Sequence, residues 1–337
     1  MNRYILFGFI FILFSFISDD AVTLLFPENW PKPKHDFKNE PLTKSKVALG
    51  RFLFYDPMLS RDSTISCASC HSPYNAFTHV DHNVSHGIND AVGTRNSPAL
   101  MNLAWHPFFM WDGAIHHIDV QALAPISHPK EMGETLEHVV KKLNQSVWYR
   151  AKFFEAFGDS QVTGHRALKA LTQFQLTLVS SNAKYDSVQQ NKASFTAQEA
   201  KGYMIFKKHC NTCHTEPLFS SYQFASNGLE MDTVFQDLGR FAISKNPKDS
   251  FLFKIPSLRN IEYSMPYMHD GRFKSLNQVL NNYNQSKKLI KNYKKLPSFH
   301  LNSNEKVDLM AFLYTLSDKK FVFNKNYEFP RELLKKK

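Results

Sequence analysis

Two short segments carry the residues best suited to bind a cofactor. CASCH spans residues 67–71 and CNTCH spans residues 210–214, and both place two thiols three positions apart with a histidine directly after the second. This spacing is the attachment signal of c-type haem, in which the thiols bond to the two vinyl groups and the histidine coordinates the iron. We therefore predict two covalently bound haem c groups, one on Cys67, Cys70 and His71 and the other on Cys210, Cys213 and His214.

A zinc site and a thioredoxin-like redox pair fit the paired cysteines less well. Zinc sites with two CxxC pairs have about 15–20 residues between the pairs and require no trailing histidine. Here about 140 residues separate the pairs. A thioredoxin-like redox pair would lie in a strand–helix–strand context, which the sequence does not show. A di-haem protein is the interpretation that accounts for all four cysteines of the chain.

The sequence around these motifs predicts a mainly α-helical fold. TAQE at residues 196–199 has the pattern of a capping box and predicts a helix through residue 209, directly before the second motif. LTKSKVALGRFLFYDP at residues 42–57 predicts a similar helix before the first motif, and residues 165–180 predict a long amphipathic helix. NSNE at residues 302–305 predicts the start of a last helix, with Val307, Met310, Leu313 and Tyr314 on one face.

These elements divide the chain into two cytochrome c-like haem domains. We expect the N-terminal domain over residues 41–180, a polar linker over residues 181–194 and the C-terminal domain over residues 195–318. Residues 319–337 are expected to form a basic tail. A chain of 337 residues is long enough for two domains that each have a hydrophobic core.

The first 20 residues indicate export. Arg3 precedes about 15 mostly apolar residues, and Asp19 and Asp20 follow them. This run is short for a membrane span of about 20 residues and typical of the apolar region of a signal peptide. No cleavage site is clear, so an uncleaved anchor is the alternative. We predict a periplasmic protein that contacts the membrane only if this segment is retained.

The formal net charge of +11 comes in part from lysine-rich pieces at residues 287–295 and 335–337. The sequence contains no nucleic-acid-binding motif and no Lys/Arg stripe interleaved with aromatic residues. We interpret the charge as scattered solvated lysines and expect no nucleic-acid partner. A homodimer is compatible with the sequence.

From about residue 41 to residue 318, the chain resembles the bacterial di-haem cytochrome c peroxidase/MauG family. The matching segments include LGRFLFYDPMLSRDSTISCASCH, GTRNSPAL, FFMWDGA, CNTCH, DLGRFAIS and IPSLRNIEYSMPYMHDGRFKSLNQVLNNYN. The resemblance implies two haem c domains with calcium between them, and a reaction with hydrogen peroxide. The haem on His71 would be the one that meets peroxide.

The resemblance also implies roles for residues after the first motif. Glu131 would be the general acid/base that moves a proton between the oxygens of bound peroxide, and Gln121 would orient the peroxide. Trp111 would relay electrons between the haems. His86, in SHGI, matches a loop histidine that binds the resting peroxidatic iron in some family members and is lacking in MauG-like ones; His79 and His82 are nearby alternatives.

The sixth ligand of the second haem separates the subclasses of the family. Classical peroxidases have a methionine fourteen residues after the histidine of the PYxH segment, whereas MauG-type enzymes have tyrosine. That histidine is His269 here, and the position is Tyr283, so the resemblance implies tyrosine ligation. Met265 and Met268 are the rival ligands. A phenolate would stabilise ferric iron and lower the potential of this haem, whereas a thioether would raise it.

The calcium site rests on the resemblance alone. It would take the side-chain oxygen of Asn96 and the backbone carbonyls of Ser264 and Pro266, completed by water. The sequence contains no acidic EF-hand loop that would indicate calcium independently.

Three functions are compatible with the sequence. The first is a peroxidase that reduces hydrogen peroxide to water with electrons from a small exported cytochrome c or copper protein. The second is a MauG-like enzyme that uses a high-valent di-haem state to oxidise residues of a partner protein, and Tyr283 favours it. The third is a di-haem electron carrier, against which Glu131 and Gln121 argue.

Overall fold

The computed structural model describes residues 20–285 and 300–336, and these residues are mainly helical, as the sequence predicts. Two short strands, β1 (Phe224–Ala225) and β2 (Phe253–Lys254), form an antiparallel pair in which Phe224 lies opposite Lys254. The α-helices are α1 (Lys44–Tyr55), α2 (Cys67–Cys70), α3 (Leu123–Ser127), α4 (Leu136–Gln145), α5 (Val147–Phe157), α6 (Gly164–Leu176), α7 (Lys184–Gln189), α8 (Ala197–His209), α9 (Phe241–Ser244), α10 (Leu276–Gln285), α11 (Ser303–Tyr314) and α12 (Lys319–Val322).

The helix before the first haem motif packs closely on the helix that ends the same half of the chain. Gly50 of α1 faces the backbone of α6 so closely that an added Cβ would lie 1.9 Å from the carbonyl oxygen of Ala170. Four residues later, the buried ring of Phe54 lies 5.2 Å from that of Phe174. Only glycine permits this approach of the two helix backbones.

The second half repeats this arrangement. An added Cβ at Gly202 of α8 would lie 1.9 Å from the carbonyl oxygen of Asp308 in α11. The buried ring of Phe206, again four residues later, lies 5.0 Å from that of Phe312. Each CxxCH motif therefore follows a helix whose glycine lets a second helix cross it closely.

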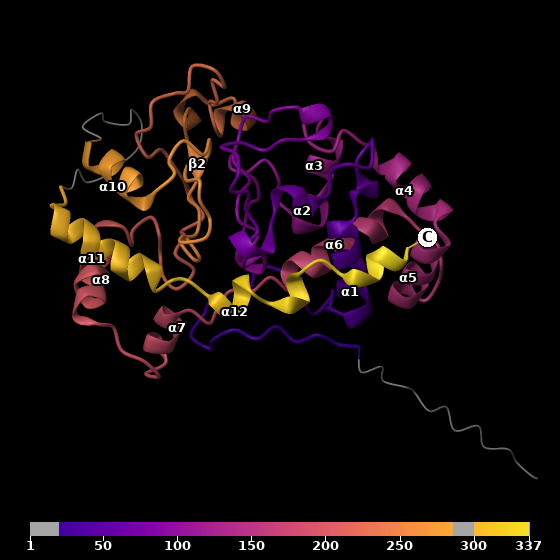
Figure 1. Ribbon diagram of the computed structural model, residues 1–337, viewed down its shortest axis with the longest axis horizontal. Coiled ribbons are helices and arrows are strands. Elements are labelled where there is room, and N and C mark those ends of the chain that lie inside the picture. Colours follow the sequence, from indigo (N-terminus) through magenta and orange to yellow (C-terminus); the bar gives the residue numbers. More distant parts are fainter. Residues whose placement is uncertain (1–19, 286–299, 337) are drawn as a thin grey trace, which may run out of the picture.

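Two hydrophobic cores are built around these helix pairs. The N-terminal core contains side chains of α1, α4, α5 and α6, and the C-terminal core contains side chains of α8, α10 and α11. The two groups of helices lie at opposite ends of the molecule, with β2 and α9 between them and α7 below (Figure 1). None of the helices in the described ranges is long and apolar enough to cross a membrane. The predicted N-terminal export segment, except Asp20, lies outside the described residues.

The capping boxes are confirmed. Thr196 accepts a hydrogen bond from the main chain of Glu199 at the start of α8, and Asn302 and Glu305 form the same reciprocal pair at the start of α11. The buried face predicted for α11 is partly wrong: Leu313 is buried, but Val307 and Tyr314 are each 48% exposed. Leu309 and Phe312 take their place, because α8 packs against that side of the helix.

The segments predicted as a linker and as a basic tail both contain helices. The segment predicted as a linker contains α7, whose Asp186 forms an ion pair with the fully buried Arg259. The segment predicted as a basic tail returns across the molecule to α1 and α5 (Figure 1), and it buries Phe321 and Val322 in the N-terminal core. Lys336, near its end, forms an ion pair with Asp56.

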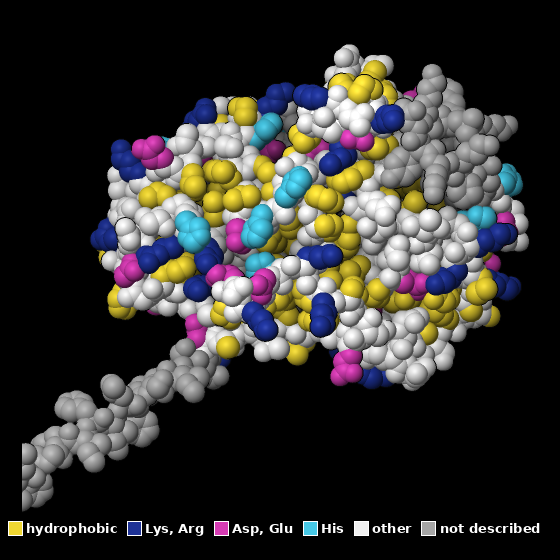
Figure 2. Space-filling model, turned by 180° about the vertical axis from the view of Figure 1, so that it is seen from behind, with side chains coloured by type: hydrophobic (Ala, Val, Ile, Leu, Met, Phe, Trp, Pro, Cys, Tyr) yellow, Lys and Arg dark blue, Asp and Glu magenta, His cyan; other side chains and the backbone are white. Residues whose placement is uncertain are grey.

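The surface seen from behind carries charges of both signs. Lysine, arginine, aspartate and glutamate side chains are interspersed over this face, and histidines gather over the N-terminal half of the chain (Figure 2). Ion pairs such as Lys152–Glu155 and Arg166–Asp159 show how acidic residues neutralise part of the basic excess.

Candidate haem sites and the segment between them

The first motif presents a histidine whose orientation and protonation state suit metal binding. Cys67 and Cys70 begin and end the short helix α2, and both thiols are free. The ring nitrogen Nδ1 of His71 lies 2.7 Å from the carbonyl oxygen of Phe77, which accepts a hydrogen bond from Nδ1–H and leaves Nε2 as the nitrogen available to iron. Burial lowers the pKa of His71 to about 4, so its imidazole is neutral, as a metal ligand must be.

The second motif has the same construction. Cys210 caps α8, and Nδ1 of His214 lies 3.1 Å from the carbonyl oxygen of Pro256 and 3.3 Å from that of Phe219. These carbonyls again leave Nε2 for iron. Burial lowers the pKa of His214 to about 4. The donor sets of both motifs therefore fit covalently attached haem.

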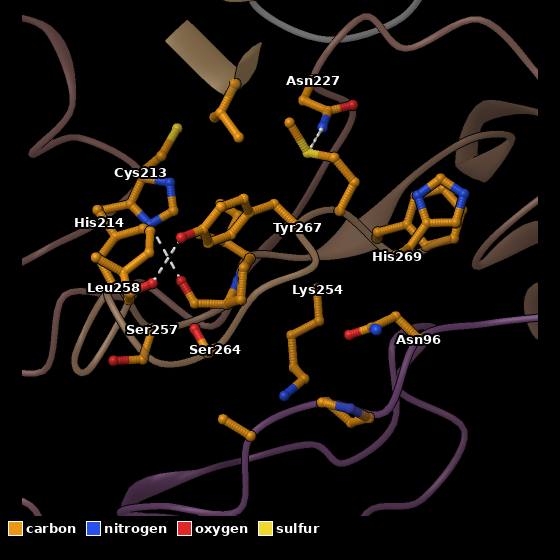
Figure 3. A pocket seen from close by; sticks show the side chains of 18 of the residues that line it. Asn96, Cys213, His214, Asn227, Lys254, Ser257, Leu258, Ser264, Tyr267 and His269 are labelled. Carbon is orange, nitrogen blue, oxygen red and sulfur yellow. Dashed lines mark hydrogen bonds between the residues drawn. The ribbon is translucent and has the colours of Figure 1, made fainter. Parts of the chain in front are cut away.

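A cavity of about 260 Å³ lies beside the second motif. Cys210, Cys213 and His214 line it, and so does Tyr283 from α10. Figure 3 shows Cys213 and His214 on one side of this cavity and Lys254 and Asn96 on another. The thiols, the imidazole and the tyrosine therefore border one space.

The two rival methionines differ in position. Met268 lines the same cavity, and its sulfur lies 3.1 Å from the side-chain nitrogen of Asn227. Met265 is 38% exposed and is not among the residues that line the cavity. Burial raises the pKa of Tyr283, and the nearby Cys210 and Cys213 add to this shift. A bound ferric iron would act in the opposite direction, because metal ions favour deprotonated ligands.

Glu131 lies close to the first motif. Burial raises the pKa of Cys67 and of Cys70, and the negative charge of Glu131 adds to both shifts, so Glu131 lies within electrostatic range of the thiols. Burial raises the pKa of Glu131 itself, and the neighbouring His128 opposes the shift. A carboxyl group with a raised pKa is suited to exchange protons near neutral pH.

Gln121 and His86, which the resemblance also assigns to the peroxide site, have defined contacts. The side-chain nitrogen of Gln121 lies 3.8 Å from the sulfur of Met110. The carbonyl oxygen of His86 accepts a hydrogen bond from the Cys70 thiol at 3.6 Å, and the main chain of Ile88 donates to the carbonyl oxygen of Glu131 at 2.8 Å. The His86 loop therefore runs between the first motif and the Glu131 segment.

His86 is one of three neighbouring imidazoles. Its ring centroid lies 4.2 Å from that of His82, which lies 5.2 Å from that of His79. All three histidines that the sequence offers for this position are thus brought together near Cys70.

Trp111 connects this region to the cavity of the second motif, which it lines. Its indole nitrogen donates to the carbonyl oxygen of Asn96 at 2.8 Å, and its own carbonyl oxygen accepts from the main chain of Lys254 at 2.7 Å. The next residue, Asp112, forms an ion pair with Arg95 at 2.6 Å, and Arg95 also pairs with Asp237. These contacts hold both the indole ring and the main chain of Trp111 in place.

The predicted calcium ligands share that cavity. Asn96, Ser264 and Pro266 all line it. The side-chain nitrogen of Asn96 donates to the carbonyl oxygen of Asn83 at 3.1 Å, which leaves Oδ1 of Asn96 as an oxygen donor for a cation.

Lys254 and His106 also line the cavity, and no motif in the sequence pointed to them. The ammonium nitrogen of Lys254 lies 3.4 Å from Nδ1 of His106, although the two residues are 148 positions apart. The only signal in the sequence is a lysine inside the otherwise apolar run FLFKIP.

Comparison with known proteins identifies the family of this chain. Residues 44–194 match the family model described as di-haem cytochrome c peroxidase. The methylamine utilization protein MauG of Methylorubrum extorquens is 38% identical over 309 residues, which cover 86% of this chain and 82% of that protein. Cytochrome c551 peroxidase of Nitrosomonas europaea is 32% identical over 83% of this chain and 84% of its own length.

A solved structure shares the fold. The crystal structure of a MauG-like protein associated with microbial copper homeostasis superposes with a TM-score of 0.82 at 29% identity, over 92% of this chain and 99% of that one. Both the sequence relatives and this structure extend across the two haem motifs. The chain belongs to the di-haem cytochrome c peroxidase and MauG family.

Proposed function

We propose that this protein reduces hydrogen peroxide to water at the haem held by His71, with electrons from a small exported cytochrome c or copper protein. The observation that carries the proposal is the partly buried Glu131, whose charge acts on Cys67 and Cys70 and whose own pKa is raised by burial. Bound haem iron would supply the peroxide-binding position and the redox change.

Glu131 would manage the protons of this reaction. The overall conversion is one peroxide, two electrons and two protons to two water molecules. The ionised carboxylate of Glu131 would take the proton from one peroxide oxygen and return it to the other oxygen. The second oxygen would then leave as water when the O–O bond breaks. Gln121, on the segment before α3, would orient the peroxide.

Electrons would reach this site through the second half of the chain. The electron donor would deliver them to the haem held by His214, and Trp111 would carry them onward. Its place on the wall of the second cavity, fixed by Asn96 and Lys254, supports this role. A calcium ion on Asn96, Ser264 and Pro266 would hold the same segments together. His86 would bind the first iron in the resting state and leave it on activation.

Tyr283 favours a second candidate function, which is MauG-like oxidation of residues on a partner protein. A tyrosine ligand makes the second haem difficult to reduce, so the oxidised protein would react with peroxide before any electron arrives. The oxidising equivalents would then be shared by both haems and could be used on a protein docked at the surface.

Export would place the protein in the periplasm, where such donors and partners occur. Covalent attachment of haem at both CxxCH motifs would suit this location, because the protein would then keep its cofactor without relying on equilibrium binding. Recovery of haem-loaded protein from the periplasmic fraction would agree with export, and haem-loaded protein confined to the cytoplasm would contradict it.

The test is peroxide consumption by the haem-loaded protein with and without a reduced donor. The peroxidase proposal expects two donor electrons oxidised per peroxide consumed. Peroxide consumption that continues only with a protein substrate, which gains oxidised residues, would support the MauG-like function. A protein that leaves peroxide intact while exchanging electrons with the donor would be an electron carrier, and the proposal would be abandoned.

A further inference from the structure

Lys254 occupies an unusual place for a lysine. It is the second residue of β2, its exposed fraction is 9%, and its side chain reaches into the cavity beside the second motif (Figure 3). Two main-chain contacts fix its position. Lys254 lies opposite Phe224 in the strand pair, and its nitrogen donates to the carbonyl oxygen of Trp111.

The ammonium group has no carboxylate partner within the described parts of the chain. No aspartate or glutamate is among the residues that line the cavity, and no ion pair of Lys254 occurs in these parts. Its polar neighbour is Nδ1 of His106 at 3.4 Å. Burial and the lysine charge lower the pKa of His106, so this imidazole is neutral and brings no negative charge.

A buried charge without a counter-charge is costly, and burial accordingly lowers the pKa of Lys254 to about 8. A lysine in such a place is stabilised when an anionic group enters the cavity. Calcium on Asn96 would add positive charge to the same space, so the need for an anion would increase.

The expected occupant of the cavity carries such anions. Haem has two propionate carboxylates, and Cys210, Cys213 and His214 would hold its ring in this cavity. We propose that Lys254 is a positioning residue that pairs with a propionate carboxylate of the haem held by His214, and thereby helps to set the potential of that haem. The inference rests on the proposed function only in requiring that haem to be bound.

The sign of the effect follows from electrostatics. A positive charge beside the haem favours the ferrous state, which carries one positive charge fewer than the ferric state. Replacement of Lys254 by an uncharged residue would leave a propionate charge uncompensated in a poorly solvated space. The ferric state would then be favoured and the potential would fall.

The experiment is a redox titration of haem-loaded Lys254→Met, Lys254→Arg and wild-type protein in the absence of peroxide. For Lys254→Met we expect at least a tenfold shift toward the ferric form of the second haem at fixed potential, which corresponds to about 59 mV for a one-electron couple. Lys254→Arg should recover most of this shift. Lys208→Met, an exposed lysine near the end of α8, is the control and should change the ratio less than twofold.

Three results would overturn the proposal. One is an unchanged potential in haem-loaded Lys254→Met. Another is an equal shift in Lys254→Met and Lys254→Arg, which would indicate packing rather than charge. If Lys254→Met fails to load haem, the crystal structure of the haem-loaded wild-type protein decides. An ammonium nitrogen more than about 4 Å from every propionate oxygen would refute the pairing. Because no peroxide is used, failure of the peroxidase proposal would leave this result intact.

Discussion

The indole nitrogen of Trp111 donates a hydrogen bond to the main-chain carbonyl oxygen of Asn96 over 2.8 Å. The main-chain nitrogen of Asn96 donates in turn to the carbonyl oxygen of His269 at 2.7 Å. The proposed electron relay and the proposed calcium ligand are therefore parts of one hydrogen-bonded unit, which connects the segment after the first motif with the segment before α10.

Replacement of Trp111 by phenylalanine should slow electron transfer between the haems by at least tenfold, because the indole and its bond to Asn96 are lost together. The measurement is the rate at which the haem held by His71 is reduced after rapid reduction of the other haem. Trp148→Phe is the matched control, since Trp148 packs on Phe52 and Tyr149 in the N-terminal core. Equal rates in Trp111→Phe and wild-type protein would exclude the relay.

Removal of calcium by a chelator should lower peroxide turnover several-fold, and calcium but not magnesium should restore it. Asn96→Leu should abolish calcium binding while it keeps the contact with Trp111, because that contact uses the main chain of Asn96. Metal analysis and calorimetry measure the binding. Asn83→Ala is the control, because Asn83 contributes only its carbonyl oxygen to Asn96. A calcium affinity in Asn96→Leu equal to that of wild type would rule out this site.

Glu131→Gln should reduce peroxide turnover by about 10²–10⁴-fold, which is the usual contribution of general acid–base catalysis. Both haems should still attach, as absorption spectra would show, because Glu131 is not one of the attaching residues. Glu137→Gln makes the same chemical change at an exposed position of α4 and should leave turnover unchanged. If Glu131→Gln turned over peroxide at the wild-type rate, Glu131 would have no catalytic role.

The pH dependence should also report on Glu131. The carboxylate accepts a proton only when it is ionised, and burial raises its pKa. Turnover should therefore fall as pH decreases through this raised pKa, at a higher pH than for an ordinary glutamate with a pKa of about 4.3. The residual activity of Glu131→Gln should lack this acidic limb. An identical limb in the variant would assign it to another group.

Tyr283→Phe should change the absorption and EPR spectra of one haem and raise its potential, because a phenolate ligand would be lost. Tyr267→Phe is a matched control from the same cavity, since the hydroxyl group of Tyr267 is engaged by the carbonyl oxygen of Ile261 at 2.9 Å. Unchanged spectra in Tyr283→Phe would exclude tyrosine ligation, and Met268→Leu would then be the variant expected to alter the spectra.

The parts of the fold that depend on local bonds were predictable from the sequence. The capping boxes at Thr196 and Asn302 join residues three positions apart, so their pattern identifies them without knowledge of the fold. The buried face of α11 was less predictable. Leu309 and Phe312 fit a helical period as well as Val307 and Met310 do, and the position of α8 decides between them.

The candidate site also has parts that the local sequence predicts and parts that depend on distant segments. The CxxCH motifs predict haem attachment from their residue types and spacing alone. The resemblance to a family identified further residues that line one cavity in the structure, such as Asn96 and Ser264. Lys254 could not be recognised in this way. Its proposed role depends on the absence of carboxylates among the described residues that line the cavity, whose walls come from distant segments, and no local pattern encodes that arrangement.

The return of residues 319–336 to the N-terminal core affects how the protein is made. Phe321 and Val322 complete a core against which Cys67 packs, and they are synthesised far later than that cysteine. The first motif is therefore synthesised long before its core can be complete, whereas the last residue of the core around the second motif, Leu316, follows that motif by about 100 residues. A fusion tag or truncation at the carboxyl end should consequently impair the haem that lies farthest from it in sequence.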